Sequence, residues 1–190
     1  MNKANLIGAV EAGGTKFVCA IGDSNGKVLL EERFPTEAPE LTLPRAIDFF
    51  KRAEETIGAV SRFGIGSFGP AGVNPERNDY GKILATPKVG WEGADFVGSF
   101  KAAFPEIPIV FETDVLAAAL GEGALGAAKG LKTYVYVTVG TGIGAGIVVD
   151  GKSLSGLLHP EVGHIVVPRL DDFEGICAFH GNCLEGLASG

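Results

Sequence analysis

Apolar runs and turn residues alternate at the start of the chain. The runs Asn5–Val10, Phe17–Ile21 and Lys27–Arg33 have the length and the composition of short strands. Between them, Glu11–Lys16 and Gly22–Gly26 contain glycines, and the second also holds Asp and Asn, which favour tight turns. The pattern predicts an antiparallel three-stranded meander.

A helical period follows this meander. Apolar residues recur on one face of Leu43–Ile57, which predicts a helix with Thr42 as its N-cap and Pro44 in its first turn. Strands and helices then alternate, and this order is typical of an α/β layer system. The further elements expected are a strand from Phe63 that runs into a glycine-rich loop, a helix over Ala94–Phe104, a strand over Ile107–Thr113 and a helix over Val115–Ala128.

A second unit begins near Lys132. The run Tyr134–Val139 is typical of a strand, and a glycine turn separates it from a second apolar run, Ala145–Val149, that continues into a hairpin. The sequence therefore predicts two α/β domains, over residues 1–115 and 116–190. We expect them to pack closely, because no low-complexity linker joins them.

Composition and charge narrow the class of protein. The 190 residues are 46% apolar, and 16 basic against 23 acidic side chains give a net charge of −7. Such an acidic chain is expected to bind neither nucleic acid nor an anionic membrane. No apolar run approaches the ~18 residues needed to span a bilayer, and the first apolar run has no cleavage-like site. We expect a cytoplasmic protein.

Two cysteines and two histidines near the end of the chain have the spacing of metal ligands. Cys177, His180 and Cys183 form a C-x-x-H-x-x-C motif, and His164 precedes it. Sulfur and imidazole nitrogen suit zinc, and four protein ligands leave no open position for a catalytic water. The sequence thus predicts a structural Zn²⁺ site. The third cysteine, Cys19, lies in an apolar strand and is expected to be a small buried hydrophobe.

Glycine is the compositional outlier, and two glycine turns occupy matching places, each between the first two strands of its unit. Glycine lets the backbone approach an anion, while exposed N–H groups and threonine or lysine side chains add donors. One such turn alone is ordinary hairpin chemistry, but the duplication favours phosphate binding. The candidate phosphate-binding residues are Gly13, Gly14, Thr15 and Lys16 in the first turn and Gly140, Thr141 and Gly142 in the second.

Two nucleotide-binding patterns also occur in the second unit. Gly146–Ser153 matches the P-loop pattern, but it holds a β-branched strand and an Asp150–Gly151 hairpin turn where a P-loop needs a flexible loop before a helix. Gly140, Gly142 and Ala145 satisfy a dinucleotide-binding pattern that must open a helix, whereas a strand is expected here. We therefore expect neither a P-loop nor nicotinamide binding.

Asp114 follows the predicted strand Ile107–Thr113, at the carboxyl edge where open α/β sheets bind ligands. Aspartate before an apolar helix is commonly an N-cap, and that alternative stays open. A hydroxyl that accepts a phosphoryl group needs a carboxylate within hydrogen-bond reach to take its proton. Beside two phosphate-binding turns, Asp114 is the candidate catalytic base.

These motifs together resemble one family. E-A-G-G-T-K, G-P-A-G, E-T-D followed by A-A-A-L-G-E, G-T-G-I-G-A-G, E-V-G-H and C-x-x-H-x-x-C-L-E occur in the order and spacing of the ROK family of sugar kinases and sugar-responsive repressors. The resemblance runs from about Gly8 to Gly190. It implies the two-domain, actin-like ATPase (ribonuclease H-like) α/β fold, with the second domain incomplete. The stretches Thr86–Trp91 and His159–His164 resemble the zinc-containing bacterial fructokinases of the family more than its glucokinases.

The resemblance also implies roles for single residues. The two glycine turns would hold the phosphates of ATP, and Asp114 would be the general base. Glu161, His164, Glu185 and Gly72 would contact the sugar, and the metal set His164, Cys177, His180 and Cys183 would hold Zn²⁺. His164 would serve both, with one ring nitrogen on the metal and the other facing the sugar.

Two departures from the family pattern affect the ligands. Glu11 stands where many relatives have aspartate, and its longer side chain would contact Mg²⁺ or the waters around it. Thr113 replaces an asparagine that contacts the sugar in glucokinases of the family, so the identity of the hexose stays open. The implied cofactors are ATP, Mg²⁺ and Zn²⁺.

The implied activity is phosphorylation of a hexose, with D-fructose converted to fructose 6-phosphate, by a cytoplasmic homodimer. Three alternatives remain: another hexokinase of the family acting on glucose, mannose or an N-acyl hexosamine, a sugar-binding regulator, or a non-catalytic fragment. The family pattern continues beyond the A-S-G that ends this sequence. We therefore expect a fragment of a longer polypeptide, with apolar faces left uncovered and weak nucleotide binding on its own.

Overall fold

The structure, a computed structural model, describes residues 5–156, 159–169 and 172–190. The chain divides into two compact units, unit 1 over residues 1–114 and unit 2 over residues 115–190. Each unit is α/β, and each is built around its own sheet.

Unit 1 contains a mixed five-stranded sheet in the order β3-β2-β1-β4-β5. The antiparallel pairs β1–β2 and β2–β3 form the predicted meander, which is confirmed. The pairs β1–β4 and β4–β5 are parallel, so their carboxyl ends meet at one edge of the sheet. The strands are β1 (Ile7–Ala12), β2 (Lys16–Gly22), β3 (Val28–Pro35), β4 (Arg62–Ser67) and β5 (Ile109–Thr113).

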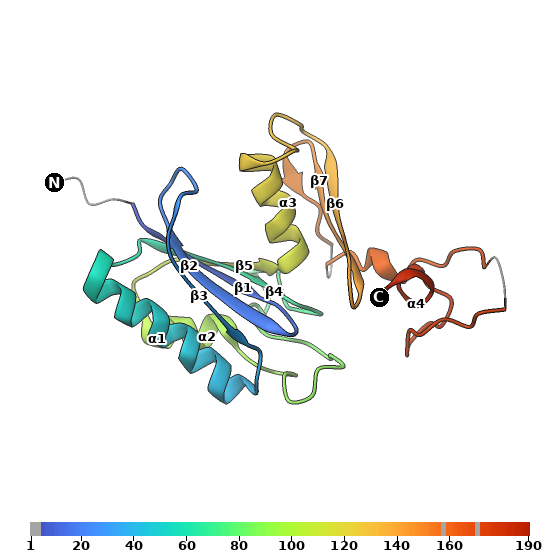
Figure 1. The fold of residues 1–190 in the computed structure, drawn as a ribbon, viewed down its shortest axis with the longest axis horizontal. Helices are drawn as coiled ribbons and strands as arrows, with labels where there is room; N and C mark the ends of the chain where they lie inside the picture. Colours follow the sequence, from blue (N-terminus) through green and yellow to red (C-terminus); the bar gives the residue numbers. More distant parts are fainter. Residues whose placement is uncertain (1–4, 157–158, 170–171) are drawn as a thin grey trace. The chain divides into compact units, whose positions relative to one another are not determined.

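Two helices, α1 (Pro39–Ile57) and α2 (Phe96–Ala103), lie on the same face of this sheet (Figure 1). The predicted start of the first helix was wrong. The helix begins at Pro39, whose fixed φ suits a first helical position, and not after Thr42. The buried Thr42 hydroxyl instead accepts the N–H of Glu37 at 3.0 Å, so it supports the helix entry from within the first turn.

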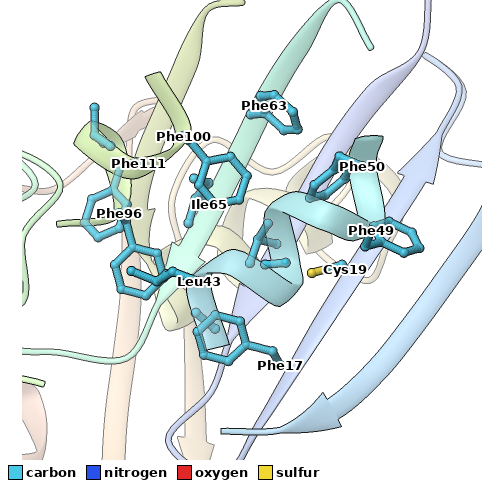
Figure 2. Packing of buried hydrophobic residues seen from close by; sticks show 14 of the residues in the cluster. Phe17, Cys19, Leu43, Phe49, Phe50, Phe63, Ile65, Phe96, Phe100 and Phe111 are labelled. Carbon is cyan, nitrogen blue, oxygen red and sulfur yellow. The ribbon is translucent and has the colours of Figure 1, made fainter. Parts of the chain in front are cut away.

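Aromatic side chains fill the space between the sheet and these helices (Figure 2). Phe63 packs edge-on against Phe50, with ring centroids 4.9 Å apart, and against Phe100 at 5.2 Å. Such pairs contribute about 0.5–1.5 kcal/mol each beyond the burial of their area. Cys19 lies fully buried in this cluster, and burial raises the pKa of its thiol to about 12. The prediction of a small buried hydrophobe is confirmed.

Unit 2 contains a hairpin extended by a short third strand, in the order β6-β7-β8. The P-loop-like segment lies within this hairpin, because Asp150 and Gly151 turn the chain with φ of 51° and 76°. The prediction that this segment is strand and turn is confirmed. The elements are α3 (Asp114–Leu125), β6 (Tyr134–Val139), β7 (Ile143–Val149), β8 (Lys152–Ser153), the 3-10 helix η1 (Val162–His164) and α4 (Leu184–Ala188).

The two units differ in the size of their cores. In unit 2, Leu116 and Ala119 of α3 and Val148 of β7 form a small buried cluster, against which Tyr134 and Tyr136 of β6 pack.

Across the described part of the chain, no helix combines the length and apolar character required to cross a membrane.

Candidate active site

The first glycine turn joins β1 to β2, and neighbouring segments hold its carbonyl groups. The carbonyl of Gly13 accepts the Thr36 hydroxyl at 2.7 Å, and that of Thr15 accepts the Thr36 N–H at 2.9 Å. The Lys88 ammonium donates to the carbonyl of Gly14. In a trans peptide unit the C=O and N–H point in opposite directions. The N–H of Gly14 therefore points away from the Thr36 hydroxyl, and that of Thr15 away from Lys88.

The absence of a side chain at Gly14 has no internal explanation. A Cβ added there would meet no atom within 4 Å, and the residue does not have a positive φ. At Gly13, by contrast, a Cβ would lie 2.8 Å from the carbonyl oxygen of Lys16. Space and outward N–H groups at one turn are what a bound anion requires.

Charged side chains of both signs surround this turn. Lys16 is exposed at the start of β2, and Lys88 reaches the turn from a loop 74 residues away from Gly14 in sequence. Glu11, also exposed, lies on β1 just before the turn. Two ammonium groups therefore serve the first turn, where the sequence indicated only one.

Parallel pairing places Asp114 at the same edge of the sheet as this turn. Ala12, Ser67 and Thr113 are register partners at the carboxyl ends of β1, β4 and β5. Asp114 follows Thr113 directly, just as Gly13 follows Ala12. Two strand spacings of about 4.8 Å separate β1 from β5, so roughly 10 Å lies between the two chain positions.

Asp114 is also the first residue of α3, and its side chain is half-buried. An acidic residue in the first turn stabilises a helix through the helix dipole, so the structural explanation of this aspartate stands beside the catalytic one. Glu112 lies two residues earlier, and burial raises the pKa of its carboxyl group to about 7. Its Oε2 atom has no hydrogen-bond partner among the described residues.

The second glycine turn joins β6 to β7 and is held at three points. The Gly140 N–H donates to the Gly142 carbonyl at 2.9 Å, and the Gly190 N–H donates to the Gly140 carbonyl at 2.7 Å. The Ile143 N–H donates to Oε2 of Glu185 at 2.8 Å. A Cβ at Gly140 would meet no atom within 4 Å, as at Gly14 in the first turn. Thr141, between the two glycines, is exposed.

The predicted metal ligands come together in unit 2. The candidate ligand atoms of His164, Cys177, His180 and Cys183 all lie within 4.8 Å of one another. Nδ1 of His164 is 3.5 Å from Sγ of Cys183 and 3.8 Å from Sγ of Cys177, which is itself 3.8 Å from Nδ1 of His180. His164 thus turns Nδ1 towards the sulfurs and leaves Nε2 for another partner.

This arrangement fits a tetrahedral zinc ion. Zn–S bonds of about 2.3 Å and Zn–N bonds of about 2.0–2.1 Å place neighbouring ligand atoms roughly 3.6 Å apart. The sulfur–nitrogen distances in the cluster lie close to that value. Backbone N–H groups, that of Phe179 first, lower the pKa of Cys177 to about 7, which favours the thiolate that binds metal. The four residues would hold Zn²⁺ as a closed, structural site.

The E-V-G-H segment and Glu185 meet at one residue of β7. The Ile143 N–H is bound by Glu185, and the Ile143 carbonyl faces Gly163, where a Cβ would lie only 2.0 Å from the carbonyl oxygen. Glu161 directly precedes η1, and His164 ends it. The predicted sugar-binding residues Glu161, His164 and Glu185 thus approach β7 from two separate segments.

Gly72, predicted to contact substrate, has an ordinary packing explanation. A Cβ there would lie 2.1 Å from the carbonyl oxygen of Asp79, and the Gly72 N–H donates to the Lys82 carbonyl at 2.9 Å. Its contact with substrate stays a prediction. Sequence reasoning missed Thr36 and Lys88, because their contacts with the first turn join residues far apart in the chain.

Comparison with known proteins gives a consistent result. The ROK family matches the chain over residues 7–190. The fructokinase of Zymomonas mobilis is 48% identical over 193 residues, which cover 100% of this chain and 64% of that protein. A ROK hexokinase from Thermus thermophilus has 30% identity and a TM-score of 0.77, over 97% of this chain and 60% of that one.

A ROK family glucokinase from Streptomyces griseus, solved with glucose and AMPPNP, has 29% identity and a TM-score of 0.74. The alignment covers 97% of this chain and 57% of the glucokinase. The chain therefore spans about three fifths of the length of these relatives.

Proposed function

This chain belongs to the ROK family, and from that premise we propose that the protein transfers the γ-phosphoryl group of ATP to the 6-hydroxyl of D-fructose. It has the actin-like ATPase fold of the sugar kinases that it resembles in structure. The activity, the substrates and the residue roles below are proposals for the whole protein.

One observation carries the proposal. The open first glycine turn and the carboxylate of Asp114 follow two strands whose carboxyl ends meet at the same sheet edge. The roughly 10 Å between them leaves room for a sugar hydroxyl hydrogen-bonded to Asp114 and for a phosphoryl group next to that hydroxyl. The phosphoryl group would in turn be hydrogen-bonded to the glycine turn. Two hydrogen bonds of about 2.8 Å and a reactive contact of about 3 Å fill most of this length.

In this proposal the glycine turns bind the phosphates. Backbone N–H groups of Gly14 and Thr15 and the Lys16 ammonium serve the first turn, where the Gly13 N–H holds the turn by donating to the Lys16 carbonyl at 3.0 Å. Gly140, Thr141 and Gly142 serve the second. Mg²⁺, which accompanies ATP, would neutralise phosphate charge near Glu11. Preorganised donors of this kind stabilise the charge that spreads over the phosphoryl oxygens during transfer.

Asp114 acts as the general base. Its carboxylate accepts the hydrogen bond of the sugar 6-hydroxyl and takes the proton as the oxygen attacks phosphorus. Asp114 is the first residue of α3, where the positive end of the helix dipole favours a negatively charged side chain.

In this proposal the sugar lies against the metal loop, the segment Cys177–Cys183 that carries three of the four proposed zinc ligands. The carboxylates of Glu161 and Glu185 accept hydrogen bonds from its hydroxyl groups, and the Nε2–H of His164 donates one. Zn²⁺ held on Nδ1 of His164 would fix the tautomer and the orientation of that ring. The geometry of the cluster supports this division of the two ring nitrogens.

The choice of fructose rests on the relatives. Identity to the Zymomonas mobilis fructokinase is 48%, against 29% to the Streptomyces griseus glucokinase. The Lys88 contact with Gly14 adds a local feature, because Lys88 belongs to the Thr86–Trp91 stretch that resembles fructokinases.

A hexose panel tests the proposal. The full-length protein is assayed with ATP and Mg²⁺ against D-fructose, D-glucose, D-mannose and N-acetylmannosamine. We expect kcat/KM for fructose to exceed that for each other sugar by at least about tenfold, a margin of about 1.4 kcal/mol. A higher value for another hexose would leave a sugar kinase with a different substrate.

Absence of turnover with every sugar would overturn the kinase proposal. Sugar binding without turnover, measured by calorimetry, would then favour the regulator. A homodimeric state and the lack of nucleic-acid binding stay predictions, which sedimentation and a DNA-binding assay can test.

A further inference from the structure

The carboxylate of Glu185 accepts a hydrogen bond from the backbone just after the second glycine turn. Sugar binding does not require this contact. Its Oε2 atom accepts the Ile143 N–H at 2.8 Å, and the side chain is half-buried. A hydrogen bond to an ionised acceptor is roughly twice as strong as one between neutral groups. One oxygen of Glu185 is therefore held at β7 by a charge-assisted hydrogen bond.

This bond fixes the orientation of the peptide unit that closes the turn. The Ile143 N–H and the Gly142 carbonyl belong to the same peptide unit and point in opposite directions. With the N–H held by Glu185, the carbonyl points to the other side, where it accepts the Gly140 N–H at 2.9 Å. Glu185 and the internal bond of the turn thus support one conformation.

The turn is also shaped to receive this carboxylate. A Cβ at Gly142 would lie 2.7 Å from Oε2 of Glu185, closer than real Cβ contacts allow. A side chain at Gly142 would therefore displace the end of the Glu185 side chain, whereas one at Gly140 would displace nothing. The two glycines of the turn differ in their surroundings, because Gly142 faces the Glu185 side chain and Gly140 faces open space.

The position of Glu185 depends on the metal loop. Cys183 caps α4, since its Sγ accepts the Gly186 N–H at 3.3 Å, and Glu185 lies in the first turn of that helix. The Leu184 N–H donates to the Ile165 carbonyl at 2.8 Å, next to His164. The residues that would hold Zn²⁺ therefore set where the carboxylate of Glu185 lies.

We propose that Glu185 is a positioning residue for the second phosphate turn, so that it sets nucleotide affinity as well as any contact it makes with sugar. This inference rests on the proposed function, because that proposal assigns the turn to phosphate. A carboxylate beside a phosphate site repels the ligand, so its benefit must come from the hydrogen bond that orders the backbone.

Two substitutions in the full-length protein separate the bond from the charge. Glu185→Ala removes the acceptor, whereas Glu185→Gln keeps a neutral carbonyl acceptor in the same place. Glu122→Ala is the matched control, because Oε2 of Glu122 also accepts a backbone N–H, that of Ala127 at 2.7 Å, away from the turn.

The first measurement is amide hydrogen exchange of the peptide that spans Gly140–Gly144, in the absence of ligands. We expect Glu185→Ala to speed this exchange at least about tenfold, Glu185→Gln to change it much less, and Glu122→Ala to leave it unchanged. Unchanged exchange in Glu185→Ala would overturn the proposal, whatever the effect on sugar.

The second measurement is the affinity for ADP without sugar. We expect Glu185→Ala to weaken ADP binding about tenfold and Glu185→Gln to restore most of it. Loss of fructose binding alone, with ADP affinity unchanged, would make Glu185 a sugar ligand only and overturn the inference. If the wild-type protein binds no ADP and phosphorylates no hexose, the proposed function fails, whereas the exchange measurement still decides the role of Glu185 in the turn.

Discussion

At the scale of single residues, the glycines of the chain fall into two kinds. Gly163 is required by a close neighbour, because a Cβ there would lie 2.0 Å from the backbone oxygen of Ile143, and a Cβ at Gly142 would displace the Glu185 carboxylate. Gly14 and Gly140 have open space above them and no positive φ. Open space also surrounds Gly121 on α3, but Gly14 and Gly140 lie in turns, where such space leaves room for a bound group.

Substitution of Gly14 tests this distinction. Gly14→Ala should leave the free energy of unfolding within about 1 kcal/mol of wild type, because the added methyl group meets nothing. It should raise KM for ATP at least about tenfold, because the methyl group occupies the space for phosphate. Thermal unfolding and steady-state kinetics measure both.

Gly121→Ala is the control for this prediction, since it also adds a methyl group to open space, but on the helix α3 and not in a turn. It should stabilise the helix by about 1 kcal/mol and leave KM for ATP unchanged. Equal KM values for both variants would show that Gly14 does not border the phosphate.

The base assignment has its own test. Asp114→Asn keeps the size and a hydrogen-bonding group but removes the proton acceptor, so kcat should fall by about 10²–10⁴ while fructose and ADP still bind. Loss of the acidic first-turn residue should cost at most about 1 kcal/mol of stability. Retention of more than about a tenth of kcat would leave Asp114 as a helix-stabilising residue only.

Glu112 makes stability depend on pH. Burial raises the pKa of its carboxyl group to about 7, so between its ordinary value of 4.5 and 7 the folded state keeps a proton that the unfolded chain has lost. The free energy of unfolding contributed by this group therefore falls as pH rises through that window.

Glu112→Gln removes this dependence, because its side chain is neutral at every pH. At pH 8 the variant should be more stable than wild type by roughly 1–2 kcal/mol, after allowance for solvent screening of a partly exposed group. Below pH 4 the two should be equal. Urea unfolding at several pH values measures the difference. Glu106→Gln is the control, because Glu106 is exposed, and its stability relative to wild type should not change with pH in this way.

At the scale of elements, strands and helices were predictable wherever the local pattern was unambiguous. The meander and the second hairpin followed from alternating apolar runs and glycine turns. The start of α1 was missed because Thr42 and Pro44 suit a first turn as well as Pro39 does. The contact of Thr42 with Glu37 decided between them, and that contact exists only in the folded chain.

The parts of the site that were predictable are those encoded by short spacing. The C-x-x-H-x-x-C motif indicated its own cluster, because the three ligands come from one short loop. The bonds from Lys88 to Gly14 and from Ile143 to Glu185 join residues 74 and 42 positions apart. Spacing carries no information about such contacts, so the supports of both turns could not be predicted.

Removal of metal should loosen an element rather than the whole protein. We expect one zinc per chain by elemental analysis. Chelation should speed hydrogen exchange at least about tenfold in the segments 159–169 and 172–190, because all four proposed ligands come from them. The strands of unit 1 serve as the internal control. No zinc, or uniform faster exchange in both units, would contradict the assignment of a local structural site.

At the scale of the whole molecule, the two units differ in the size of the apolar core that each contains. The core of unit 1 is a continuous aromatic cluster, whereas the buried cluster of unit 2 consists of Leu116, Ala119 and Val148. Val135, Val137 and Val139 on β6 are each more than half exposed. Because buried apolar area is the main source of stability, the units should open at different free energies.

Native-state hydrogen exchange on this chain measures that difference. Amides of β1 and β4 should exchange at least about 100-fold more slowly than those of β6 and β7, a gap of about 2.7 kcal/mol. Equal protection in the two sheets would mean that the chain unfolds as one cooperative body, and a single unfolding transition would then describe it.

The burial of Cys19 has a practical consequence for how this protein can be observed. A thiol with a pKa of about 12 and no exposed surface is silent towards alkylating dyes and disulfide reagents in the folded state. Cys183 is equally covered, while Cys177 is partly exposed and far more acidic. Fast labelling should therefore report on one sulfur, that of Cys177, which is one of the four proposed metal ligands. If the cluster binds zinc as we propose, the unmodified chain would carry a built-in colorimetric indicator of whether the ion is bound.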